Sequence, residues 1–159
     1  LYAALVALVL ASLFYFNLRE VPPKSGASEA RSVMQVAMQS RIKLFWRPKA
    51  ITKKPGDQSE MRMEITATAT GLSVHNPTPY YITLAWLSKN AKTQLPGFDS
   101  LMIAPFATAS TSTGDYHGSY YSVGYIDDYG ALKKVDVTCA GKAPCQLSER
   151  KGQNNAQAR

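Results

Sequence analysis

The chain has 159 residues, enough for one domain of ordinary size or for one complete domain with a piece of another. Its 18 Lys and Arg residues against 11 Asp and Glu residues give a formal net charge of +7. The basic residues are scattered, with neither a helical basic stripe nor a stacking-aromatic motif, which argues against a nucleic-acid-binding protein. Their local cluster is predicted to be a solvated linker and consists of Arg47, Lys49, Lys53 and Lys54.

The first 16 residues contain no charged side chain, which is typical of a signal-peptide core or a membrane span. This segment is shorter than the ~20 residues that a spanning helix needs. Near its end Phe14, Phe16 and Leu18 occupy alternate positions, which predicts a strand over about Leu13–Arg19. We therefore expect residues 1–11 to lie outside the fold, with an N-terminal membrane anchor as the competing interpretation.

A second, longer strand is predicted over Val33–Trp46. Met34, Val36 and Met38 occupy alternate positions, the period-two pattern of a strand with one apolar face. Lys43 is a lone lysine in the strand-forming sequence that follows. An Arg-Pro pair then ends the strand, because proline has no N–H group to donate.

After the basic linker, short β-rich runs alternate with turn signals, the spacing expected of an all-β sandwich. Strands are predicted over Met61–Ala67, Leu72–His75, Tyr80–Leu87, Leu101–Ile103, Thr108–Thr113, Ser122–Asp127, Lys134–Cys139 and Gln146–Leu147. Residues 148–159 are polar and without periodicity, and are expected to form a disordered tail.

Two cysteines, Cys139 and Cys145, are separated by the turn-forming stretch Ala-Gly-Lys-Ala-Pro. In an oxidising compartment the natural interpretation is a disulfide that closes this turn, and its short loop predicts only about 2 kcal/mol of stabilisation. A redox pair is less well supported because the C-x-x-C spacing is absent. Metal binding needs two more ligands, which nothing nearby supplies, so neither a metal nor another cofactor is expected.

Four blocks of the sequence, in the same order, resemble the periplasmic chaperones of the chaperone–usher pilus pathway. They are Leu13–Pro23, Arg41–Pro48, Asn76–Leu84 and Tyr125–Ala131. The resemblance implies an all-β, immunoglobulin-like fold, with a complete C-terminal β-sandwich over residues 48–147. Residues 12–47 then correspond to the last two strands of an N-terminal domain of the same type. The apolar segment 1–11 is foreign to the family pattern, which predicts a chain that lacks most of the N-terminal domain.

The resemblance also implies roles for residues of the long strand. The family donates alternate residues of this strand, here Met34, Val36 and Met38, into the groove of an incomplete pilin fold, while main-chain hydrogen bonds supply affinity. The matching lysine, here Lys43, pairs with the C-terminal carboxylate of a pilus subunit. The arginine with which the family holds the same carboxylate belongs to a strand that is absent here. Without the family pattern, an ordinary core strand with a lysine at its solvated end fits equally well.

A further pair of residues is implied to fix the angle between the domains. Arg47 and Asp128 match an inter-domain ion-pair arrangement of the family, whose third, acidic member is replaced by Ala11. Without that pattern, each of these residues is expected to be a solvated surface charge.

Catalysis has little support in the sequence. Asp115, His117 and Ser119 lie close together, but a catalytic triad is a spatial arrangement, and the interleaved glycines predict a turn. His75 and His117 are far apart in the sequence and lack companion ligands. We therefore expect neither an enzyme nor a small-molecule substrate.

The leading hypothesis is a periplasmic chaperone that binds and caps pilus subunits by donor-strand complementation and delivers them to an outer-membrane usher. The missing strands are expected to impair this activity. Two alternatives stay open. One is a non-functional remnant with an aggregation-prone hairpin, and the other is a β-sandwich binding module tethered to a membrane by residues 1–16.

Overall fold

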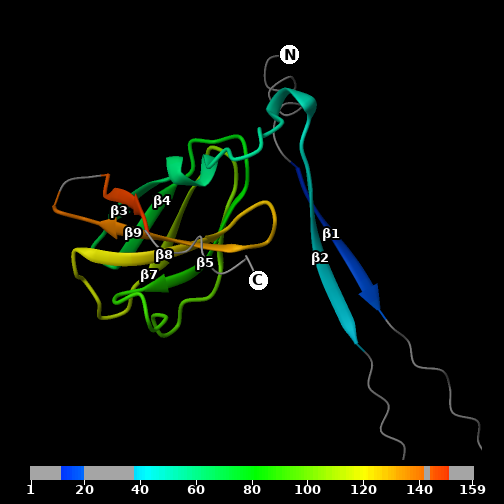
Figure 1. Cartoon of the computed structure of the whole chain (residues 1–159). Coiled ribbons are helices and arrows are strands. Elements are labelled where there is room, and N and C mark those ends of the chain that lie inside the picture. The colour runs from blue at the N-terminus through cyan, green and yellow to red at the C-terminus, as the bar shows by residue number, and fades with distance from the viewer. Residues whose placement is uncertain (1–11, 20–37, 142–143, 151–159) are drawn as a thin grey trace, which may run out of the picture.

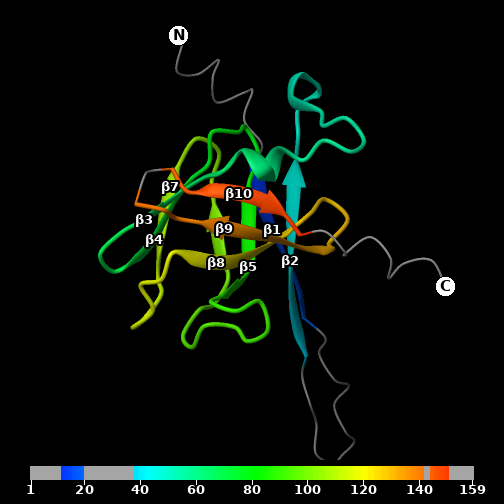
Figure 2. The ribbon, with the colours of Figure 1, turned by 60° about the vertical axis from the view of Figure 1, so that its left-hand side comes forward.

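The computed structural model of the chain describes residues 12–19, 38–141 and 144–150. These residues form a two-stranded hairpin and a β-sandwich, from which the hairpin projects (Figures 1 and 2). The predicted all-β class is confirmed. In the described part of the chain, no helix is long and apolar enough to span a membrane.

The sandwich consists of a five-stranded sheet of order β10-β9-β8-β5-β6 and a three-stranded sheet of order β3-β4-β7, in which all neighbours are antiparallel. Its strands are β3 (Glu64–Ala67), β4 (Gly71–His75), β5 (Ile82–Ser88), β6 (Leu101–Ile103), β7 (Thr108–Ser112), β8 (Tyr120–Ile126), β9 (Leu132–Thr138) and β10 (Gln146–Glu149). Two short 3-10 helices, η1 (Lys49–Ile51) and η2 (Ser59–Arg62), lie between the hairpin and β3.

The core of the sandwich lies between its two sheets. Successive side chains of a strand point to opposite faces, so Leu72 and Val74 of β4 are buried while Ser73 between them is only partly buried. Ile65 of β3, in the three-stranded sheet, and Val137 of β9, in the five-stranded sheet, are completely buried. Full burial of each such aliphatic side chain stabilises the fold by roughly 1.5–3 kcal/mol.

The hairpin pairs β1 (Ser12–Arg19) with β2 (Gln39–Trp46) along its whole length, with Phe16 opposite Ile42. Directly opposed residues of an antiparallel pair share a face, so the alternation of both strands places their large apolar side chains on one face. On that face five side chains are 49–60% exposed: Phe16, Leu18, Ile42, Leu44 and Trp46. The predicted strand residues before Met38 lie outside the described residues.

The prediction of a strand that begins at Met61 is wrong. Met61 belongs to η2, and β3 begins only at Glu64. The N–H groups of Met61 and Met63 donate hydrogen bonds to the carbonyl oxygens of Gln58 and Glu60. The backbone therefore turns at these residues instead of extending.

The predicted end of the sandwich at Leu147 is also wrong. β10 continues through Glu149 in register with β9, and Arg150 then forms an ion pair with Asp136. These last residues belong to the sandwich and not to a disordered tail. The rest of the predicted tail, residues 151–159, lies outside the described residues, and so does the segment 1–11.

The predicted disulfide between Cys139 and Cys145 is confirmed. It connects the end of β9 to the start of β10, and both cysteines belong to the main core, with 8% and 6% of their surface exposed. The bond therefore fixes the edge strand of the five-stranded sheet to its neighbour.

We expect the double variant Cys139→Ala and Cys145→Ala to lower the free energy of unfolding by about 2 kcal/mol, because the bond closes a short loop. Urea denaturation followed by fluorescence measures the difference. A thiol reductant should lower the stability of the parent chain and leave that of the variant unchanged. Equal stabilities of parent and variant under oxidising conditions would contradict this expectation.

Candidate functional site

The end of β2 carries Lys43 and Phe45 on one side of the strand, and Arg47 continues this alternation just beyond it. This side meets the sandwich. The ring centroid of Phe45 lies 5.7 Å from that of Tyr81, and Arg47 reaches Asp128. Lys43 is exposed two residues before Phe45. The candidate carboxylate-binding lysine thus lies on the side of β2 that contacts the sandwich.

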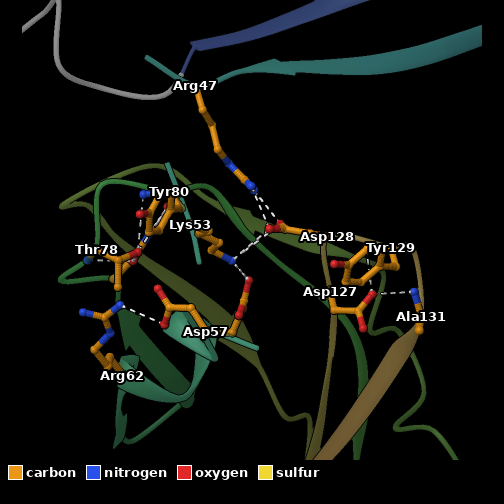
Figure 3. A network of polar contacts seen from close by, with 12 residues as sticks. Arg47, Lys53, Asp57, Arg62, Thr78, Tyr80, Asp127, Asp128, Tyr129 and Ala131 are labelled. Atoms are coloured by element: carbon orange, nitrogen blue, oxygen red, sulfur yellow. Dashed lines mark hydrogen bonds and ion pairs between the residues drawn. The ribbon is translucent and has the colours of Figure 1, made fainter. Parts of the chain in front are cut away.

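Arg47 and Asp128 form a two-pronged ion pair (Figure 3). The Nη1 and Nη2 atoms of the arginine donate to the two carboxylate oxygens over 2.7 and 2.5 Å. This hydrogen bonding lowers the pKa of Asp128 and raises the pKa of Arg47. The two side chains are 28% and 32% exposed. The structure brings these predicted partners together, and their role in fixing a domain angle stays a prediction.

The turn between β8 and β9 holds Asp128 in place. The Oδ1 atom of the preceding Asp127 accepts hydrogen bonds from the N–H groups of Tyr129 and Ala131 over 3.0 and 2.8 Å (Figure 3). The N–H of Asp127 also donates to the carbonyl oxygen of Ala131. The hydrogen bonds of Asp127 therefore fix the backbone of the turn from which the side chain of Asp128 extends.

The prediction that Lys53 belongs to a solvated linker is wrong. Its Nζ atom forms an ion pair with Glu60 and lies 3.5 Å from the carboxylate of Asp128. The side chains of Lys53 and Glu60 are only 7% and 6% exposed. Sequence reasoning missed Glu60, because one acidic residue among turn-forming neighbours has no diagnostic spacing.

Tyr80 forms a platform beneath both cations. The guanidinium carbon of Arg47 and the Nζ of Lys53 lie 5.2 and 5.0 Å from the centroid of its ring. The side-chain amide of Asn76 donates to the carbonyl oxygen of Tyr80 over 2.6 Å, and its Oδ1 accepts from the N–H and hydroxyl of Thr78. The block Asn76–Leu84, which carries part of the family resemblance, contains these residues, but its sequence does not indicate that Asn76 positions the ring of Tyr80.

Two hollows flank the Arg47–Asp128 pair. The first, of about 460 Å³, lies between the end of β2 and the sandwich and is lined by Phe45, Arg47, Glu60, Tyr81, Thr83, Ile126, Asp127, Asp128 and Gly130. The second, of about 640 Å³, is bounded by linker residues 52–58 and by parts of β8, β9 and β10. The first hollow has aromatic walls and opens beside the side of β2 that carries Lys43. An extended peptide is the kind of ligand that such a cleft accommodates.

Of the predicted donor residues, Met38 is 62% exposed, whereas Met34 and Val36 lie outside the described residues. Ala11, which takes the place of the acidic member of the ion-pair arrangement, also lies outside them. Across the described ranges, no three His, Cys, Asp or Glu side chains are grouped so as to hold a metal ion. The structure therefore adds no metal-binding arrangement to the candidate site.

Ionised Asp128 stabilises the fold, and its lowered folded-state pKa sets the pH range of this effect. The stabilisation is fully present above its ordinary value of 3.8 and is lost as the pH falls through the lowered value. We expect the difference in free energy of unfolding between the parent chain and Asp128→Asn to shrink as the pH falls below about 4. Denaturation of both proteins from pH 7 to pH 2 measures it.

The control for this experiment is the same substitution in the Arg47→Gln background. Because the hydrogen bonds from Arg47 are the main cause of the lowered pKa, the difference should then depend on pH less strongly than in the parent background. A difference that keeps its size down to pH 2 in the parent background contradicts the assignment.

Two models of one family match the chain. "Pili and flagellar-assembly chaperone, PapD N-terminal domain" matches residues 11–52, and "Pili assembly chaperone PapD, C-terminal domain" matches residues 58–136. The "Uncharacterized fimbrial chaperone YbgP" of Escherichia coli K12 is 46% identical over 140 residues, which are 88% of this chain and 58% of that protein. The Escherichia coli "Chaperone protein PapD" is 37% identical over 141 residues, 88% of this chain and 56% of its own length.

Among solved structures, the Salmonella enterica SafA pilin in complex with the SafB chaperone contains a chain with a TM-score of 0.66. Its sequence identity is 24%, and the match covers 81% of this chain and 60% of that one, so the likeness shows the fold. The chain therefore has the immunoglobulin-like fold of pilus chaperones and spans 56–58% of the two relatives named above. Both family models and these relatives establish that the chain belongs to the PapD family of pilus-assembly chaperones, a chaperone family and not an enzyme family.

Proposed function

We propose that this chain binds pilus subunits in the periplasm by donating the strand over Val33–Trp46, and that it delivers them to an outer-membrane usher. The observation that carries the proposal is that one edge of β2 has no partner strand among the described residues. In the described residues, β2 pairs only with β1, so the main-chain groups along its other edge have no sheet partner. A subunit that lacks a strand can pair with this edge, and alternate side chains then fill its groove.

Met38 supports the position of the donated segment. It is 62% exposed at the start of the described part of the strand, and Met34 and Val36 precede it at the same period. A flexible methionine side chain adapts to grooves of differing shape. The three residues are therefore proposed to occupy successive pockets of the bound subunit.

Lys43 is proposed to bind the C-terminal carboxylate of the subunit. It lies on the same side of β2 as Phe45, which lines the cleft next to the sandwich. An ammonium group on this side can form a charge-assisted hydrogen bond with a chain end that enters there. The partner of this bond is a carboxylate, so the proposal depends on a free C-terminus of the subunit.

The periplasmic location is supported by the disulfide between Cys139 and Cys145, since such bonds persist in oxidising compartments. Subunit binding is supported by the solved structure named above, in which SafB is in complex with a pilin. The division of this chain into a part of an N-terminal domain, residues 12–47, and a sandwich domain that begins at residue 48 belongs to the same proposal.

We expect Lys43→Met to weaken the binding of a pilus subunit by about 10- to 150-fold, the equivalent of one charge-assisted hydrogen bond. Titration calorimetry with peptides that carry the last residues of subunits from chaperone–usher systems measures the change. Lys49→Met is the matched control, because Lys49 is an exposed lysine of the linker.

An amidated peptide tests the carboxylate directly. It should bind the parent chain and Lys43→Met equally, because the group that Lys43 contacts is then neutral. A loss of affinity in Lys43→Met that persists with the amidated peptide contradicts the carboxylate assignment.

We expect Met38→Asp to abolish most subunit binding, because a carboxylate in an apolar pocket of the groove loses its hydration without gaining a partner. Gln39→Asp places the same charge on the opposite side of the strand and should retain most of the affinity. Native gel shifts with unfolded subunits compare the two variants. Similar affinities of the two variants would show that the subunit does not bind alternate side chains of the strand.

The alternative of an inactive remnant has its own signature, since the apolar face of the hairpin favours self-association. Sedimentation with and without added subunit distinguishes a working donor strand from an inactive remnant. A donor strand gives a one-to-one complex at the expense of self-associated chain, whereas a remnant self-associates regardless of the subunit.

A further inference from the structure

The linker after β2 is held to the sandwich at a second place beyond Arg47. We propose that Lys53, Glu60 and Tyr80 are positioning residues that fix the direction of the hairpin relative to the sandwich. The inference concerns the free chain, so it does not depend on whether pilus subunits bind.

Four charged groups alternate in sign through one chain of contacts. Arg47 donates to Asp128, the ammonium of Lys53 lies 3.5 Å from the same carboxylate, and Lys53 also forms an ion pair with Glu60. Lys53 is thus shared between the β8–β9 turn and η2 (Figure 3 shows it directed toward Asp128). Because both carboxylates contact the same lysine, the linker loses both contacts if it moves away from the sandwich at Lys53.

The two ion pairs differ in burial. The side chains of Arg47 and Asp128 are 28% and 32% exposed, whereas those of Lys53 and Glu60 are 7% and 6% exposed. Water and salt screen a partly exposed pair, which by itself restrains direction weakly. A buried pair is screened much less, and removal of one partner leaves an uncompensated charge. The Lys53–Glu60 pair is therefore the firmer of the two attachments.

Tyr80 contacts both attachments of the linker, the one at Arg47 and the one at Lys53. Both cations lie over its ring, and Ile51 of η1, which is 8% exposed, forms a small buried cluster with Tyr80 and Tyr81. Linker residues on both sides of η1 thus contact one ring. Two attachments separated along the linker restrain rotation of the hairpin, which one attachment permits.

The direction of the hairpin can be measured as a distance between two spin labels. Ser40 in β2 and Ser110 in β7 are exposed, and the described part of the chain has no free cysteine that competes for the label. Cysteines at these positions report the hairpin relative to the sandwich. A second pair, at Ser110 and Ser148 in β10, lies within the sandwich and reports whether it stays folded.

We expect Lys53→Met to widen the distribution of the Ser40–Ser110 distance by about twofold or more, as one attachment of the hinge is lost. The Ser110–Ser148 distance should not change. Lys54→Met is the matched control, because it removes an exposed lysine next in the chain and should leave both distances as in the parent. Lys53→Arg should retain the narrow distribution, because it restores a cation within reach of both carboxylates.

The reversed pair, Lys53→Glu with Glu60→Lys, separates a local ion pair from the shared arrangement. It restores the attraction between the two residues but places a carboxylate beside Asp128, so the distribution should stay wide. A narrow distribution in the reversed pair or in Lys53→Met overturns the proposal, and so does a wide one in Lys53→Arg. If Lys53→Met also alters the distance within the sandwich, Lys53→Arg and the reversed pair decide in the same way.

Subunit binding is measured separately on the same variants. A widened distance with unchanged subunit affinity supports the positioning role and shows that subunit binding does not depend on it. Unchanged distances overturn the positioning role whatever the affinity is.

Discussion

The attachment of the linker to Tyr80 is the constraint on which the arrangement of this molecule depends. Within the described residues, the hairpin and the sandwich form separate sheets, and no strand pairing joins them. What connects them is a short linker whose cations, Arg47 and Lys53, lie over one buried aromatic ring. That ring is held in turn by the buried amide of Asn76. The direction of β2 therefore rests on side-chain contacts and not on a continuous sheet.

The proposed function gives the strand β2 two roles. The two sides of β2 differ, because its period separates Ile42 and Leu44 from Lys43 and Phe45. The apolar side lies in the exposed face of the hairpin, and the other side meets the sandwich through Phe45. The edge of β2 that has no partner strand among the described residues lies between these sides and is open to pairing with another chain. In the proposed function, strand pairing and side-chain recognition therefore use different parts of the same strand.

The sequence predicts those features that repeat with the period of a strand. The hairpin, most sandwich strands and the disulfide follow from alternation, turn residues and cysteine spacing, and the partners Arg47 and Asp128 follow from family blocks. Lys53 was wrongly predicted to be solvated and Glu60 was missed, because buried and exposed charges look alike in a sequence. Only the fold places this carboxylate against the lysine. The early start assigned to β3 has a similar cause, since the apolar Met61 and Met63 suggest a strand where the backbone in fact turns.

The burial of the Lys53–Glu60 pair is better explained by direction than by stability. A buried ion pair often contributes little net stability, because desolvation of both groups offsets their attraction. It does, however, restrict the arrangements that satisfy both charges. A donor strand that is already held in one direction loses less conformational freedom when a subunit binds, and each backbone residue left to be ordered costs roughly 1–2 kcal/mol. Fixing the linker before binding therefore favours strand donation more than an equal gain in the stability of the sandwich.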